Sequence, residues 1–188
     1  MTTFLIRHGK PASTWGEPDE DPGLDDTGHA QARAVAEKLL SLPEDLRPLA
    51  VTSSPLRRCR ETAQPLADAL GVVVEIDPAV GEIPTPSALS QAERPAGLQG
   101  AFGGAWSDIV GDIDYEAWRR SVTEAVARRP RTAVFSHFVA INAVASLLTG
   151  SDRVIAFRPD HTSVTRLTNA DGVLGLDVLG GEAVTGVL

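Results

Sequence analysis

The sequence predicts an α/β protein with a mostly parallel central sheet. Three observations lead to that prediction. Short β-rich runs alternate along the chain with longer segments whose apolar residues have helical spacing. The chain has 188 residues, the length of one domain or at most two small ones. With 43% hydrophobic residues, it also has enough apolar side chains for one substantial core.

Six short apolar runs are predicted to be strands. Most contain valine, isoleucine, threonine or phenylalanine, the residues that fit a pleated surface, and turn-forming residues lie between the runs. They span residues 3–6, 49–52, 72–76, 132–136, 163–167 and 173–179. The last two flank the sequence Asn-Ala-Asp-Gly, so we expect them to form a terminal hairpin.

Four longer segments have the apolar spacing of helices. The first is expected to begin near Asp26 or Thr27, after a polar loop that contains several prolines. The second is expected to have Ser54 as its N-cap and Pro55 as its first residue, and to end at Gly71. The third and fourth are expected at residues 115–128 and 139–148.

Charge and composition exclude several classes of function. The net charge is −8, which argues against nucleic-acid binding because affinity for phosphate backbones comes from clustered lysine and arginine. An acidic surface also repels anionic membranes, and no apolar run approaches the ~20 residues that span a bilayer. The first apolar run is cut short by Arg7, unlike a signal peptide, and Cys59 is the single cysteine. We therefore expect a cytoplasmic protein.

Polar residues that could take part in catalysis or ligand binding follow three of the predicted strands. Because ligands bind beyond the carboxyl ends of parallel strands, residues at these ends are expected to meet in one crevice. They are Arg7, His8 and Gly9 after the first strand, Ser53, Ser54, Arg57 and Arg58 after the second, and Ser136 and His137 after the fourth. Two histidines and at least two arginines would then share one site.

This combination of residues is typical of a phosphate site. Arginine presents a planar, permanently charged fork that pairs with phosphate oxygens, and a helix start adds free N–H groups. A histidine among arginines has a lowered pKa, so His8 would be neutral and able to attack phosphorus, with Gly9 letting the backbone approach its ring. His137 could stabilise the transferring phosphoryl oxygens.

Five ordered segments resemble the histidine phosphatase superfamily, also called phosphoglycerate-mutase-like. They are LIRHGKPA, LDDTGHAQA, TSSPLRRCRETA, VFSHFVAINAV and HTSVTRL. The resemblance implies a three-layer fold with helices on both sides of the sheet, and a single histidine phosphatase domain over residues 1–188. A stretch at about 83–114, interrupted by prolines and glycines, has no counterpart and is expected to be an irregular, lid-like excursion.

The resemblance also implies a role for each matched residue. His8 is the nucleophile that becomes phosphohistidine, and Arg7, Arg58 and His137 hold the phosphoryl group. Glu82 falls on the acid that protonates the leaving oxygen and then activates water. No metal or cofactor is implied, and the four histidines lack the spacing of zinc ligands.

Four positions depart from the family pattern. Lys10 stands where Glu or Gln is common and adds positive charge at the pocket mouth, and Phe138 replaces a common glycine and brings an aromatic ring to the site. We expect both to contact substrate. His161 occupies a usual asparagine position and its role is open, while Glu82 lacks the family's usual following residues. Trp15 and Trp106 are further candidates for an aromatic mouth beside Phe138.

Three functions are compatible with these residues. The favoured one is a metal-independent phosphomonoesterase that acts on a small phosphorylated metabolite or a phosphoprotein. The second is a mutase that moves phosphate within a sugar acid. It is less favoured because mutase relatives carry longer insertions that keep water out. The third is a phosphate-binding protein without turnover, consistent with the changes at Lys10 and Phe138. The physiological substrate and the oligomeric state are not readable from the sequence.

Overall fold

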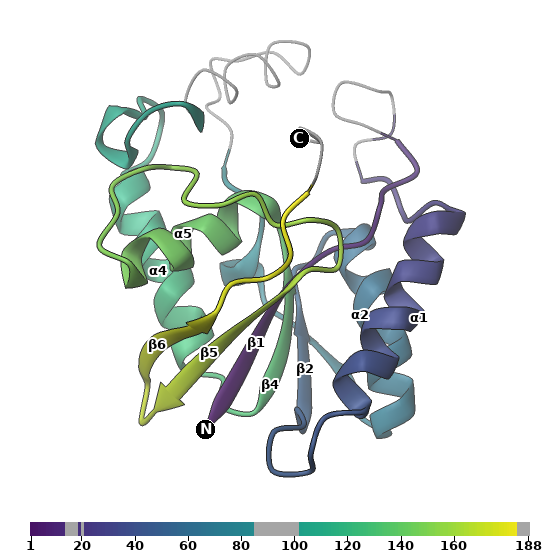
Figure 1. Cartoon of the computed structure of the whole chain (residues 1–188). Coiled ribbons are helices and arrows are strands. Elements are labelled where there is room, and N and C mark those ends of the chain that lie inside the picture. Colours follow the sequence, from purple (N-terminus) through teal and green to yellow (C-terminus); the bar gives the residue numbers. More distant parts are fainter. Residues whose placement is uncertain (14–18, 20, 85–101, 184–188) are drawn as a thin grey trace.

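The computed structural model describes residues 1–13, 19, 21–84 and 102–183. Within these residues, six strands form one sheet in the order β3-β2-β4-β1-β5-β6 (Figure 1). Their bounds are β1 Thr2–Arg7, β2 Ala50–Ser53, β3 Val74–Ile76, β4 Thr132–Ser136, β5 Val164–Ala170 and β6 Val173–Val178. All six predicted strands are therefore present, and β3 begins two residues later than expected.

The sheet is mixed but mostly parallel. Strand β4 lies between β1 and β2 and is parallel to both, and β3 is parallel to β2. Strand β5 runs antiparallel to β1, and β6 runs antiparallel to β5. The β5–β6 hairpin turns at Asp171 and Gly172, whose φ angles of 51° and 84° suit a two-residue turn with left-handed residues. Both the parallel sheet and the terminal hairpin are thus confirmed.

Helices cover both faces of the sheet (Figure 1). On one face α1 (Asp26–Leu40) packs against α2 (Arg57–Leu70), and on the other α4 (Tyr115–Ala127) packs against α5 (Phe138–Leu148). Neighbouring residues of β1 alternate between the two cores, Phe4 and Ile6 facing the first helix pair and Leu5 the second. This confirms the three-layer prediction. Among the described residues no helix is long and apolar enough to cross a membrane.

The two predicted helix starts have different outcomes. Helix α1 begins where expected, and the Asp25 carboxylate caps it by accepting a hydrogen bond from the Gly28 N–H at 2.7 Å. Helix α2 begins at Arg57 and not at Pro55, and its N-cap residue, Leu56, makes no side-chain capping bond. The prediction that Ser54 caps this helix is therefore wrong. Its hydroxyl is used elsewhere, as described below.

One short 3-10 helix precedes the predicted excursion and a second lies within it. They are η1 (Pro78–Val80) and η2 (Trp106–Asp108). Trp106 is only 1% exposed, and its Nε1 donates to the Ser146 hydroxyl at 3.0 Å. Trp106 therefore belongs to a third apolar cluster beside α4 and α5, so of its two possible places, the pocket mouth and the core, the structure shows the core. Residues 85–101, within the expected excursion, and Trp15 lie outside the described residues.

Candidate active site

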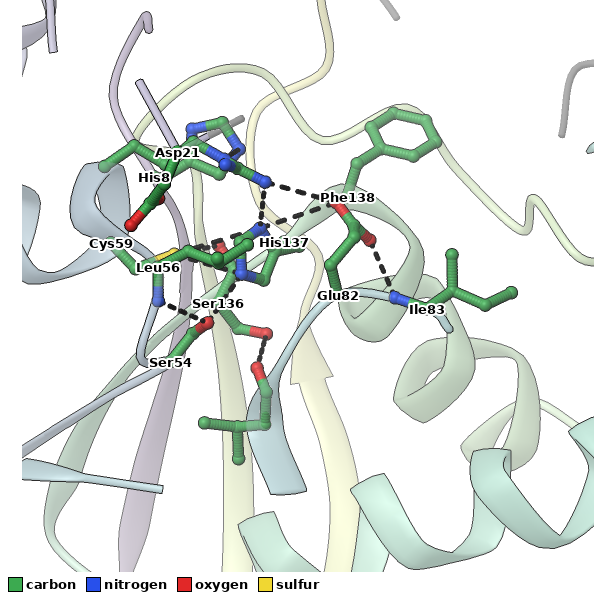
Figure 2. Close-up of polar contacts among 12 residues, drawn as sticks. His8, Asp21, Ser54, Leu56, Cys59, Glu82, Ile83, Ser136, His137 and Phe138 are labelled. Carbon is green, nitrogen blue, oxygen red and sulfur yellow. Dashed lines mark hydrogen bonds and ion pairs between the residues drawn. The ribbon is translucent and has the colours of Figure 1, made fainter. Parts of the chain in front are cut away.

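The carboxyl ends of β1, β4 and β2 meet at one edge of the sheet. The backbone N–H of His8 donates to the Ser136 carbonyl at 3.0 Å, and the N–H of Ser54 donates to the Phe135 carbonyl at 3.0 Å. Because β4 is the middle strand of the three, its following residue, His137, lies between His8 and Ser54. Figure 2 shows these side chains gathered at the strand ends.

His8 is held with one ring nitrogen free to act. Its Nδ1 lies 2.8 Å from the Gly9 carbonyl oxygen, and because a carbonyl can only accept, Nδ1 carries the hydrogen. Nε2 then has a lone pair, which accepts a hydrogen bond from Arg58 Nε at 3.3 Å. Burial, assisted by His137, Arg58 and Arg7, lowers the pKa of His8 well below its usual value. The ring is therefore neutral near pH 7.

His137 is fully buried and lies between the ends of β1 and β2. Its Nε2 lies 2.7 Å from the Ser54 hydroxyl oxygen (Figure 2). Its Nδ1 lies 3.3 Å from Arg58 Nη2 and 3.4 Å from Glu82 Oε2. Burial is the main cause that lowers the pKa of His137 well below its usual value, with Arg58 and Arg7 adding to it. The His8 and His137 ring centroids are 5.3 Å apart.

The loop after η1 carries Glu82 into the site. The Ser136 hydroxyl, at the end of β4, donates to the Val80 carbonyl at 2.7 Å and fixes the loop to the sheet. The Ile83 N–H donates to Glu82 Oε1 at 3.1 Å, which leaves Oε2 directed at His137 (Figure 2). The bond from Ser136 thus fixes the loop, and the bond from Ile83 fixes the direction of the Glu82 carboxylate.

Burial raises the pKa of the Glu82 carboxyl. Arg58, the Ile83 N–H and Arg7 oppose the increase, but desolvation outweighs them. Glu82 Oε2 is 3.9 Å from Arg58 Nη2, too far for a direct hydrogen bond. A carboxyl group with a raised pKa can be protonated near neutrality, which is the property that a proton donor needs.

Two buried arginines give the site a positive field. Arg7 Nη1 donates to the Pro159 carbonyl at 2.9 Å, its guanidinium lies 5.1 Å from the Phe138 ring centroid, and its Nε has no partner among the described residues. Burial lowers the pKa of Arg7 to about 10. Arg58 faces both histidines, and among the described residues Glu82 is the carboxylate that contacts Arg58. Unpaired guanidinium groups of this kind suit an oxyanion.

Lys10 lies farther out than the other predicted residues. Its Nζ forms an ion pair with Asp25 Oδ2 at 2.8 Å, and its side chain is 54% exposed. Its backbone N–H donates to Gln31 Oε1 at 2.9 Å, which ties the loop after β1 to α1. The structure therefore does not bring the Lys10 ammonium into contact with the histidine and arginine cluster.

Two other residues beside His8 are held by packing. Phe138 is 7% exposed, and its ring lies against Arg7 and near Phe102, with ring centroids 6.4 Å apart for the aromatic pair. A Cβ on Gly9 would come within 2.8 Å of the Gly28 carbonyl oxygen. Gly9 is therefore needed for contact with the first turn of α1. Its carbonyl oxygen, 2.8 Å from His8 Nδ1, also brings the backbone close to the His8 ring, as expected.

Ser54, Cys59 and His161 also contact or approach the two histidines, and none of these particular contacts was predicted from the sequence. The Ser54 hydroxyl bonds His137, and Cys59 Sγ lies 3.4 Å from His137 Nε2, where burial raises the pKa of the thiol. The His161 ring centroid lies 5.9 Å from that of His8. Ser54 carried a positional signal because it directly follows a strand, and His161 carried one because it lies in a segment that resembles the family. In the described part of the chain, no group of three or more His, Cys, Asp or Glu side chains is arranged to hold a metal ion.

Comparison with known proteins identifies a family and related chains. The family model for the histidine phosphatase superfamily, branch 1, matches residues 3–180. Among curated proteins, the 55 kDa subunit of yeast transcription factor tau (Saccharomyces cerevisiae) is 35% identical over 107 residues. That match covers 52% of this chain and 24% of the yeast protein, so the chain spans about a quarter of that relative.

Solved phosphatase structures share the fold over nearly the whole chain. A mycobacterial glucosyl-3-phosphoglycerate phosphatase in complex with VO3 is 26% identical, covers 96% of this chain and 99% of its own, and has a TM-score of 0.71. A phosphoserine phosphatase from Entamoeba histolytica, in complex with 3-phosphoglyceric acid, has a TM-score of 0.74 at 18% identity, with 96% of both chains covered. At that lower identity the likeness is one of fold.

Proposed function

The chain belongs to the histidine phosphatase superfamily, and from that premise we propose that it hydrolyses phosphomonoesters through a phosphohistidine on His8. The observation that carries the proposal is the bond between His8 Nδ1 and the Gly9 carbonyl. It fixes the tautomer in which Nε2 is the nucleophilic nitrogen. The lowered pKa of His8 keeps that nitrogen unprotonated near neutral pH.

In the first step, His8 Nε2 forms a bond to phosphorus and the ester P–O bond breaks. Arg7 and Arg58 hold the non-bridging oxygens, and His137 lies within 3.3 Å of Arg58 on the same side of the cluster. The protonated Glu82 carboxyl gives its proton to the leaving oxygen, so the alcohol departs neutral. The carboxyl's raised pKa supports that role.

In the second step, water attacks the phosphorus of phosphohistidine. Glu82, now a carboxylate, takes the proton from the water, the N–P bond breaks, and inorganic phosphate leaves. His8 returns to its neutral form and Glu82 to its protonated form, so one cycle consumes one ester and one water. Arg7 and Arg58 already supply positive charge at the phosphoryl oxygens, which supports a mechanism that needs no metal.

A small phosphorylated metabolite or a phosphoprotein is the proposed substrate class. The mycobacterial relative at 26% identity is named for a phosphoglycerate ester, which supports a small anionic ester. Lys10 lies after the nucleophile on an exposed segment and is proposed to attract such an anion at the pocket mouth. We further propose that the protein acts in the cytoplasm.

The experiment is an assay of the purified chain with an aryl phosphate, with chelator present, beside His8→Ala. We expect phosphate release by the wild type and a loss of at least about 1,000-fold in His8→Ala, because removing a nucleophile removes the whole route. His29→Ala is the matched control, since that histidine is exposed on α1 and outside the cluster. Rapid quenching with labelled substrate should trap a phosphoenzyme that is stable to alkali and labile to acid.

The outcomes separate the three candidate functions. Turnover that survives in His8→Ala, or that stops with chelator, contradicts the proposed mechanism. Exchange of label between two positions of a substrate, without net phosphate release, identifies a mutase. Phosphate binding without phosphoenzyme or release identifies a binding protein, an outcome in keeping with the partial likeness to a transcription-factor subunit.

A further inference from the structure

His161 lies in a tight turn that is attached to the backbone of Arg7. The turn closes with a bond from the Ser163 N–H to the Asp160 carbonyl at 3.0 Å, and Thr162 adopts a φ of 55°. A β-branched residue in the left-handed region is strained and persists only where its surroundings hold it. Here the Thr162 N–H donates to the Arg7 carbonyl at 3.1 Å, and the Arg7 N–H donates to the Ser163 carbonyl at 3.3 Å.

The Arg7 side chain is bound to the same segment. Its Nη1 donates to the carbonyl of Pro159, two residues before His161. Main-chain and side-chain bonds of one arginine therefore fix the backbone of the turn that carries His161.

Among the described residues, the ring nitrogens of His161 are free to make hydrogen bonds to a ligand. Its side chain is 9% exposed, and neither ring nitrogen has a hydrogen-bond partner in the described part of the chain. The closest carboxylate oxygen, Asp160 Oδ1, is 4.0 Å from Nδ1. The ring faces that of His8 at a centroid distance of 5.9 Å and an angle of 49°.

Burial, assisted by nearby positive charge, keeps this ring neutral. Burial and then Arg7 lower the pKa of His161 to about 4, and Lys10 acts in the same direction. Asp160 and Asp25 oppose the decrease. Near neutral pH the imidazole therefore has one N–H to donate, and it adds no positive charge that would hold product phosphate.

We propose that His161 contacts substrate directly, and that its ring N–H donates a hydrogen bond to an oxygen of the phosphoryl group bound in front of His8. This inference rests on the proposed function for the identity of the ligand. Asparagine, the residue that the family commonly has here, also offers an N–H donor, whereas leucine fills similar space without one. The residue therefore matters through its donor and not through its bulk.

The test measures the dissociation constant of inorganic phosphate by titration calorimetry near neutral pH. The proteins are the wild type, His161→Asn, His161→Leu and the exposed control His29→Leu. We expect His161→Leu to weaken binding by about 10-fold or more, because a hydrogen bond to a charged group is lost. His161→Asn should stay within about 3-fold of the wild type, and His29→Leu should not change.

A second measurement follows the titration of His161 by NMR with nitrogen-15 in the histidine rings. A bound phosphate dianion favours the charged ring, so saturating phosphate should raise the pKa of His161 above its value of about 4 in the free protein. A ring remote from the bound phosphate, such as that of His29, should show no such response, while the His161→Leu titration tests for the direct hydrogen bond. Unfolding curves of both variants check that each is folded.

Binding by His161→Leu that equals the wild type overturns the proposal, as does a His161 pKa that phosphate leaves unchanged or a wild type that binds no phosphate. The measurement needs no turnover, so its failure is distinct from failure of the proposed hydrolysis. A protein that binds phosphate through His161 but forms no phosphoenzyme keeps this inference and rejects the hydrolysis. If the wild type turns over substrate and His161→Leu binds phosphate as tightly as the wild type, the hydrolysis is kept and this inference is rejected.

Discussion

Two clusters of charged side chains balance the charge of their arginines differently. The acidic residues of the first come just before the 3-10 helix η1, and Glu82 of the second comes just after it. In the first, Arg129 Nη2 contacts Asp77 Oδ2 at 2.6 Å and Glu75 Oε1 at 3.0 Å. Its Nη1 donates to the Ala125 carbonyl at 2.6 Å, and its Nε donates to the Thr52 hydroxyl at 3.1 Å. Every nitrogen of this guanidinium has a partner in its own chain.

The second cluster, beyond η1, is left with excess positive charge. Arg7 and Arg58 are both buried, and in the described part of the chain the carboxylate nearest to Arg58 is that of Glu82, at 3.9 Å and with a raised pKa. Arg58 makes its hydrogen bonds to two histidines, His8 and His137, whose pKa values are lowered. Neither ring neutralises the guanidinium.

The difference separates stability from binding. A buried charge that its own chain pairs contributes to the folded state, and breaking the pair is costly. A buried charge that its own chain does not pair lowers stability unless a ligand supplies the counter-charge. We infer that the cluster of Arg7 and Arg58 is kept unpaired for an anion, whereas Arg129 joins α4 to the loop after β3.

The largest expected effect comes from replacing one arginine of each cluster with methionine. Arg58→Met should reduce phosphatase activity by about 100- to 1,000-fold, because a donor to the phosphoryl oxygens is lost. In phosphate-free buffer it should unfold no more easily than the wild type, since a buried, unpaired charge is removed. Arg129→Met should leave activity within about 2-fold and lower the free energy of unfolding by about 2–3 kcal/mol.

Each variant is the control for the other, with kcat/KM and chemical unfolding as the measurements. Phosphate should raise the melting temperature of Arg129→Met as it does for the wild type, and should have little effect on Arg58→Met, because only bound ligand stabilises. Equal losses of activity and stability in both variants would contradict the distinction between the clusters.

A smaller effect, about 100-fold, is expected from Glu82→Gln with an alkyl phosphate, because the leaving oxygen loses its proton donor. An aryl phosphate has a better leaving group and should react with little loss in the first step. Its phosphoenzyme should then accumulate as a burst, since the base for the second step is also missing. Stopped-flow detection of the phenol measures the burst. Glu75→Gln, in the Arg129 cluster, is the matched control.

The same variant tests the pH dependence. The nucleophile must be neutral, so kcat/KM of the wild type should fall as pH decreases through the lowered pKa of His8. The acid must be protonated, so kcat/KM should also fall as pH rises through the raised pKa of Glu82. Glu82→Gln should lose the alkaline decrease and keep the acidic one. An unchanged alkaline limb would assign it to another group.

The smallest effect is expected at Lys10, which is neither buried nor unpaired. Its ion pair with Asp25 is half exposed, so Lys10→Met should change the free energy of unfolding by less than about 1 kcal/mol. If the ammonium attracts anionic substrates, KM should rise by about 2- to 5-fold at low salt and converge on the wild type at high salt. Initial rates at two ionic strengths decide this, and a change in kcat alone would reject the role.

Much of the fold was predictable because it depends on local pattern. The strands and helices follow apolar periodicity, and the helix end at Gly71 follows from its left-handed φ of 68°. The start of α2 was not predictable in the same way. Ser54 has the residue type of an N-cap, but its position beside His137 gives its hydroxyl a stronger partner than the helix.

The sequence by itself determined which residues stand at the strand ends, and with them His8, Arg58 and His137 as candidates. Tertiary structure decided three further matters. It placed β4 between β1 and β2, which puts His137 beside His8. Among the described residues, it gave Arg58 a carboxylate no nearer than 3.9 Å, while it paired Arg129 with Asp77 at 2.6 Å. It also brought His161 to His8 across the chain. The reason is that periodicity reports one residue's local surroundings, whereas strand order and charge pairing depend on distant segments meeting.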